Sequence, residues 1–152
     1  MSKRNTVISL ATVPAVAVLI SSCAPAANNG AHSNLTVQCR ETLTNRDVTD
    51  GSVSGSGHCT MTGMLHDNGP ATDYRTANAI TVHIRRVITG AKGTITFMIT
   101  IPLVGGGGER WTITSGTKTY TKLHGHGYQV VDNYQGDPAT FVLKGNVSQA
   151  RA

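Results

Sequence analysis

Two histidines separated by one residue, His124 and His126, have the spacing that could hold a metal ion. In an extended segment, residues i and i+2 point to the same side, so both imidazoles could face one ion, with Asp132 as the nearest carboxylate. Zinc sites need three or four such ligands. The position four residues after His126 is Val130, where a metal-binding strand of this type would carry a glutamate. We therefore interpret the pair as a solvent-exposed turn and predict no metal site.

Patterns typical of catalysis are weak in this sequence. His66 and Asp67 could form a base with its orienting carboxylate, but adjacent residues in an Asp-Asn-Gly-Pro turn point apart. The glycines at 105–108 lack the lysine, the hydroxyl residue and the helix of a phosphate-binding loop, and we interpret them as a hairpin lip. No Gly-x-Ser-x-Gly nucleophile turn is present. The sequence therefore predicts no catalytic residue and no cofactor, and favours a non-catalytic protein.

The sequence has three cysteines, of which one is a candidate for lipidation and two could pair with each other. If Cys23 carries lipid, as argued next, Cys39 and Cys59 remain as an even pair in an oxidising compartment. A disulfide between them would stabilise the fold by roughly 3 kcal/mol in the chain-entropy model. The alternative is two reduced thiols buried on adjacent strands. The spacing Cys-x-x-Cys, which is typical of zinc sites, is absent.

The N-terminal segment has the pattern of a secretory leader. Lys3 and Arg4 precede an apolar run, 7–20, which is shorter than the roughly 20 residues that cross a bilayer. The run ends in Leu-Ile-Ser-Ser-Cys, which resembles the bacterial lipobox, whose cysteine is acylated and becomes the first mature residue. We predict a lipoprotein signal peptide at 1–22, lipidated Cys23 with a flexible tether at 23–33, and attachment to the extracytoplasmic face of the cell membrane. An ordinary signal peptide that happens to contain a cysteine is the alternative.

Composition limits the remaining classes of protein. The 152 residues fit one domain, and 39% are hydrophobic while only 14% are charged. Loss of Lys3 and Arg4 with the leader would reduce the net charge from +5 to +3. No basic run beyond Arg85-Arg86 and no aromatic platform beside it is present, so nucleic-acid binding is not expected.

Alternation of apolar and polar residues predicts strands throughout the mature chain. In the clearest case, Ile95, Phe97, Ile99 and Ile101 alternate with polar or flexible residues. Turn-forming segments, among them Asp50-Gly51 and the Asp-Asn-Gly-Pro sequence at 67–70, separate such runs. The predicted strands are 34–42, 57–65, 79–88, 94–101, 109–114, 127–133 and 140–148. Their number and spacing favour an all-β fold, a small antiparallel barrel of about eight strands at 34–149, over a sandwich.

The C-terminal half also carries a family pattern. A Gly-Thr-hydrophobic strand at 93–97 is followed by Trp-x-Ile-x-Ser-Gly-Thr-x-x-Tyr at 111–120, Leu-x-Gly-x-Gly at 123–127, and a last strand with Gly-x-Val at 145–147. This resembles the barrel family of allene oxide cyclases, dirigent proteins and small secreted bacterial relatives, over about 35–147. The resemblance implies the barrel fold. Neither plant group's active-site positions can be matched here, and Lys118 stands where relatives commonly carry glycine.

The interior of such a barrel is either filled or hollow. The residues expected to line a cavity, if one exists, are Met61, Met64, Phe97, Ile99, Trp111 and Tyr128. We predict a lipid-anchored protein that binds an apolar small molecule or an envelope protein. The alternatives are a cyclase or isomerase acting inside the cavity, and a purely structural surface lipoprotein. An open apolar cavity with buried polar groups would favour the enzyme, and a filled core with an exposed apolar patch would favour protein binding.

Overall fold

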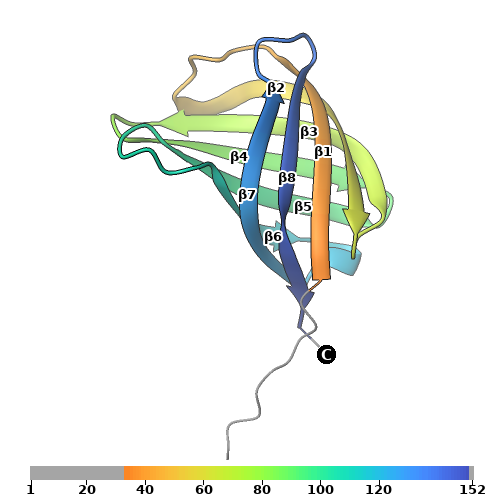
Figure 1. Ribbon diagram of the computed structural model, residues 1–152. Coiled ribbons are helices and arrows are strands. Elements are labelled where there is room, and N and C mark those ends of the chain that lie inside the picture. The colour runs from red at the N-terminus through yellow and green to blue at the C-terminus, as the bar shows by residue number, and fades with distance from the viewer. Residues whose placement is uncertain (1–32, 151–152) are drawn as a thin grey trace, which may run out of the picture.

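Eight antiparallel strands close into a barrel in the computed structural model, which describes residues 33–150 (Figure 1). Each strand pairs with its neighbours in sequence, and β8 returns to pair with β1. Closure leaves no unpaired edge, which protects the strands from pairing with another chain. The elements are β1 (Ser33–Leu43), β2 (Asp50–Gly63), β3 (Asp67–Ala77), β4 (Thr81–Gly90), β5 (Gly93–Pro102), β6 (Arg110–Gly116), the 3-10 helix η1 (Lys118–Tyr120), β7 (Leu123–Asn133) and β8 (Ala139–Gln149).

The predicted all-β barrel of about eight strands is confirmed, but the strand list missed β3. The prediction of a turn in the Asp-Asn-Gly-Pro sequence at its start is wrong, because these residues belong to the strand. Gly69 is required there for close strand approach, since a Cβ on it would lie 2.0 Å from the Thr89 carbonyl oxygen. Pro70 precedes Ala71, the first residue of β3 that pairs with β4, so a proline is tolerated at this position. A turn is also predicted at Asp50-Gly51, but Asp50 is the first residue of β2.

The two ends of the barrel differ in construction. Three long loops, 44–49, 103–109 and 134–138, and the short loop 78–80 lie together at one end, which we call the open end. The short turns 64–66 and 91–92 and the η1 segment 117–122 lie at the other, the closed end. β1 begins and β8 ends at the closed end, so both described chain termini lie there (Figure 1).

Large side chains fill the interior toward the closed end. Trp111 is 1% exposed, and its indole Nε1 donates to the carbonyl oxygens of Tyr128 and Lys144 at 3.1 and 3.2 Å. Gly127 and Gly145 face this ring, and a Cβ on either would lie within 2.7 Å of an indole carbon. Such glycines provide the space for the indole.

Tyr120 of η1 covers the interior at the closed end of the barrel. Its ring is 1% exposed and its hydroxyl donates to Asp67 Oδ2 at 2.8 Å. The Asp67 carboxylate also accepts from the backbone amides of Ala91 and Lys92. Burial opposes its charge, but these donors hold the pKa of Asp67 below its ordinary value. One carboxylate therefore joins β3, the β4–β5 turn and η1.

The predicted disulfide between Cys39 and Cys59 is present. The two residues are directly opposite each other on β1 and β2, with their Cα atoms 4.1 Å apart. Both side chains point into the barrel and are almost fully buried.

Candidate functional site

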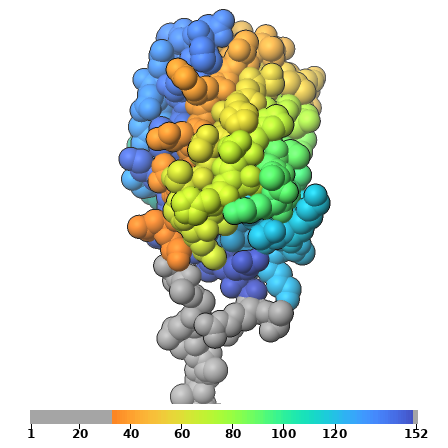
Figure 2. Space-filling view, turned by 90° about the vertical axis from the view of Figure 1, so that its right-hand side faces the viewer, coloured from red at the N-terminus to blue at the C-terminus, as the bar shows by residue number. Residues whose placement is uncertain are grey.

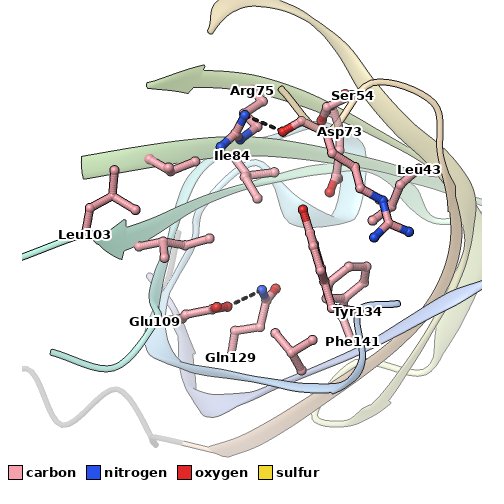
Figure 3. Close-up of a pocket in the computed structure, with 14 residues that line it drawn as sticks. Leu43, Ser54, Asp73, Arg75, Ile84, Leu103, Glu109, Gln129, Tyr134 and Phe141 are labelled. Carbon is pink, nitrogen blue, oxygen red and sulfur yellow. Dashed lines mark hydrogen bonds between the residues drawn. The ribbon is translucent and has the colours of Figure 1, made fainter. Parts of the chain in front are cut away.

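The open end contains a cavity of about 370 Å³ (Figure 3). Its walls are mainly apolar, and its volume lies within the roughly 300–1,000 Å³ typical of small-molecule sites. Glu109 and Gln129 lie across the cavity from Arg75, Ser54 and Asp73, while Tyr134 and Phe141 form a third side. The apolar lining residues are Leu43, Val82, Ile84, Ile101, Leu103, Val131, Tyr134 and Phe141.

A buried ionic network separates the cavity from the filled core. Arg86 is fully buried, and its guanidinium donates to Asp73 through Nε and Nη2 at 2.9 and 2.7 Å. The same Nε lies 2.9 Å from Glu41 Oε1 on the neighbouring side. Phe141 packs against the guanidinium, with 5.0 Å between Cζ and the ring centre. One cation is thus shared by two carboxylates inside the barrel.

The network continues to the cavity wall. Arg86 Nη1 approaches Gln129 Oε1 at 3.4 Å, and Gln129 Nε2 donates to Glu109 Oε2 at 2.6 Å. Asp73, Gln129 and Glu109 all line the cavity, whereas Arg86 and Glu41 lie behind them. A molecule in the cavity would therefore meet polar groups whose orientation the buried guanidinium fixes.

Glu41 is the exceptional member of this network. Its side chain is fully buried, and Oε2 has no hydrogen-bond partner. Burial raises the pKa of Glu41 to about 8, with Asp73 adding to the rise and Arg86 opposing it. By contrast, the two carboxylates raise the pKa of Arg86, although burial alone would lower it. At neutral pH we therefore expect Glu41 to hold a proton while Arg86 stays charged.

Two further arginines lie at the rim of the cavity. Arg75 Nη1 donates to the carbonyl oxygens of Arg46 and Val48 and so holds the β1–β2 loop in place. The Arg46 guanidinium stacks on Tyr134, 4.7 Å from the ring centre. The cavity therefore offers cationic groups at its rim and apolar walls below them.

The six residues expected to line a cavity do not line this one. Met61, Phe97, Ile99 and Trp111 do point inward, but they pack against one another and their neighbours in the filled core. Phe97 and Trp111, for example, meet edge to face at 5.4 Å. Met64 and Tyr128 point outward, and they are 38% and 50% exposed. The cavity instead lies toward the open end, where the inward-facing side chains are shorter or charged.

The chemistry-bearing motifs of the sequence are dispersed. His124 and His126 lie on β7 with their side chains exposed on the outer wall, and Asp132 is exposed farther along the strand. His66 is exposed, while Asp67 is committed to Tyr120 and backbone amides. Within residues 33–150, the only grouping of potential metal ligands is Cys39, Glu41 and Cys59, whose sulfurs are joined to each other. The glycines at 105–108 belong to the β5–β6 loop beside the cavity.

Sequence reasoning missed the ionic network, although a signal was available. The alternation that places Val82 and Ile84 inside also places Arg86 inside. On β1, Glu41 follows Val37 and Cys39 on the inward side in the same way. Charged residues at inward positions of otherwise apolar strands are informative because they need buried partners.

Comparison with known proteins adds no relative. The chain matches no protein-family model, and no curated protein is similar to it. Among residues 33–150, no helix has the length and apolar character needed to cross a bilayer. The predicted signal peptide 1–22, the lipidated Cys23 and the tether, apart from Ser33, lie outside the described residues.

Proposed function

We propose that this protein is a lipid-anchored binding protein that holds one small, largely apolar molecule in the open end of its barrel. The cavity carries this proposal, since it has mainly apolar walls, a few fixed polar groups and an entrance between the long loops. A membrane tether at Cys23 would enter at the closed end, where β1 begins. The entrance would then face away from the membrane. The resemblance to the allene oxide cyclase and dirigent family is consistent with this proposal and stays a prediction.

The rim suggests that the ligand carries an anionic or strongly polar group. Arg46 and Arg75 are both cavity residues, and arginine suits oxyanions such as carboxylates and phosphates. An apolar body would lie against Ile84, Ile101 and Val131, and its polar group would lie near the arginines.

Native mass spectrometry of a chain beginning at Ala24 and recovered from a bacterial secretory pathway tests the proposal. A discrete added mass that is lost on activation is expected. Replacing Val131 with tryptophan should fill the cavity and abolish the added mass. Val130→Trp is the matched control, because Val130 points outward and is 41% exposed. A bare wild-type mass, together with no binding of apolar probes, would overturn the proposal and favour an envelope protein as the partner.

Two fluorescent probes test the ligand's charge. Anilinonaphthalene sulfonate is anionic, and N-phenylnaphthylamine has a similar aromatic body without charge. Arg46→Gln should weaken binding of the sulfonate by roughly fivefold, as expected for loss of a partly exposed ion pair worth about 1 kcal/mol. Binding of the neutral probe should change little. Equal loss for both probes would contradict an anionic ligand.

An open apolar cavity with buried polar groups beside it also fits the alternative, a cyclase or isomerase, and the pair of carboxyl groups around Arg86 is the observation that favours it. Asp73 lines the cavity, and Glu41 behind it holds a proton near neutral pH. Proton transfer at such a site is within the chemistry of a carboxyl pair. An enzyme would convert the molecule identified by mass spectrometry into an isomer of equal mass and different chromatographic mobility. Asp73→Asn should abolish that conversion and retain probe binding.

A further inference from the structure

The closed end carries a concentration of positive charge. Its connecting segments contain Lys92, Lys118 and Lys122, all exposed, and no acidic residue. Asp67, at the start of β3, accepts hydrogen bonds from Tyr120 and from the backbone amides of Ala91 and Lys92. These lysines therefore have no acidic partner among the residues of the closed-end turns.

The three lysines lie in adjoining pieces of backbone. Thr119 N donates to the Lys92 carbonyl at 3.3 Å, which joins the β4–β5 turn to η1. Lys122 O accepts from Ala150 N, so Lys122 lies beside the end of β8. β8 in turn pairs with the first residue of β1 through Ser33 and Val147. In Figure 2 the start of β1 (orange), the η1 region (cyan) and the end of β8 (blue) gather at the bottom of the molecule.

Lys118 has an unusual backbone for a lysine. Its φ is +51°, the left-handed region that glycine adopts freely and other residues seldom occupy. Its side chain is exposed and makes no hydrogen bond or salt bridge in the structure. The contact it does make is through its carbonyl, which accepts from Thr121 Oγ1 at 2.7 Å. Packing inside the protein therefore does not account for a lysine at this position.

The loops of the open end have the opposite charge. They contain Asp47, Glu109 and Asp137 against Arg46, while Arg75 and Arg110 lie on the adjoining strands. They also expose apolar side chains, with Ile80, Leu103 and Val104 each more than half exposed. An anionic surface would therefore attract the closed end more strongly than the open end.

We propose that the closed end, through Lys92, Lys118 and Lys122, docks on the anionic headgroups of the membrane to which the chain is tethered. The tethering itself rests on the function proposed above. Anionic lipid is the occupant that fits, because the patch is basic and lies where the chain leads to Cys23, ten residues before β1. Basic residues beside a lipid anchor strengthen membrane attachment and fix its orientation. Docking would hold the cavity entrance away from the bilayer.

The test uses the chain beginning at Ala24, without acylation, so that neither lipid anchor nor cavity contributes. The eight strands and all of their pairings lie within Ser33–Gln149, so this chain contains the whole barrel. We expect it to sediment with vesicles of equal phosphatidylglycerol and phosphatidylcholine, not with phosphatidylcholine alone, and to be released by salt. Each lysine near an anionic surface strengthens binding about fivefold, so Lys92→Gln, Lys118→Gln and Lys122→Gln together should weaken it roughly 100-fold.

A second triple variant removes the same charge from the outer wall. Arg40, Arg110 and Lys144 are exposed on β1, β6 and β8, and their replacement with glutamine should weaken vesicle binding by less than about fivefold, since separated charges are screened. Equal weakening by both triples would overturn the proposal in favour of diffuse charge attraction. Failure of the wild-type chain to bind would also overturn it. Neither result bears on ligand binding in the cavity or on acylation of Cys23, which are tested by separate measurements.

Discussion

The two halves of the barrel interior share one wall and differ in what they enclose. Toward the closed end, Trp111, Phe97 and Tyr120 occupy the space completely, and glycines at 127 and 145 make room for the indole. Toward the open end, the inward residues include Ser54, Asp73 and Gln129, and a cavity remains. Strand number fixes the width of a barrel, while side-chain volume decides whether it is filled.

The boundary between the halves is ionic. Arg86, Asp73 and Glu41 lie between the apolar core and the cavity, fully or almost fully out of contact with solvent. Isolated buried charges are costly, whereas paired ones approximately balance. This layer is therefore stable only as a unit, and it presents rigid polar groups to the cavity. The filled half provides stability, and the ionic layer provides a polar floor for the open half.

The largest effect is expected from removing the shared cation. Arg86→Met leaves Asp73 buried without its partner, so the free energy of unfolding should fall by about 3–5 kcal/mol. Urea unfolding measures this change. Arg85→Met is the matched control: Arg85 is the next residue but points outward and stacks on Tyr74 at 4.0 Å, and its loss should cost about 1 kcal/mol or less.

If Arg86→Met does not fold, the stability of the double variant Arg86→Met with Asp73→Asn can be measured instead. It removes the uncompensated charge and should recover part of the stability. A loss below about 1 kcal/mol for Arg86→Met alone, within the range of an exposed pair, would contradict a structural role for the ionic layer.

Two isoleucines on β5 compare the halves directly. Ile99 is fully buried in the filled core, while Ile101 lines the cavity. Ile99→Ala should create a new void and cost about 2–5 kcal/mol, whereas Ile101→Ala enlarges an existing cavity and should cost roughly 1 kcal/mol. Thermal and urea unfolding measure the two differences. Equal losses would mean that the open half is packed as tightly in solution as the closed half.

The fold was predictable from sequence to a greater extent than the site. Alternation is a local property, and it identified seven strands and the barrel, whereas the cysteine count and the expected oxidising compartment identified the disulfide partners Cys39 and Cys59. The strand at 67–77 was missed because Gly69 and Pro70 are typical of turns, and only the folded barrel reveals that Gly69 permits a close approach to β4 and that Pro70 precedes the pairing with that strand.

The cavity could not be located from sequence because it depends on which inward residues meet at the same height. The side chains of Met61 and Ile84 both point inward, yet Met61 lies in the core and Ile84 lines the cavity. Strand register and tilt set these heights, and neither is encoded in a local pattern. The partners of Arg86 come from β1, β3 and β7, which are far apart in the chain.

The last prediction concerns pH and would sharpen the assignment of charge in the ionic layer. The pKa of Glu41 is raised to about 8 in the folded protein, while an unfolded glutamate titrates near its ordinary value of 4.5. Between these values the folded state holds a proton that the unfolded state has lost, so the free energy of unfolding should fall as pH rises through this window. One proton limits the slope to about 1.4 kcal/mol per pH unit.

Glu41→Gln mimics the protonated carboxyl and should flatten the dependence of the free energy of unfolding on pH between pH 5 and 8, as measured by urea unfolding at several pH values. Because Glu109 lies at the cavity wall and is part-exposed, Glu109→Gln should leave the slope in place. An unchanged slope in Glu41→Gln would mean that both carboxylates stay ionised around the single guanidinium, and the layer would then carry a net negative charge beneath the cavity.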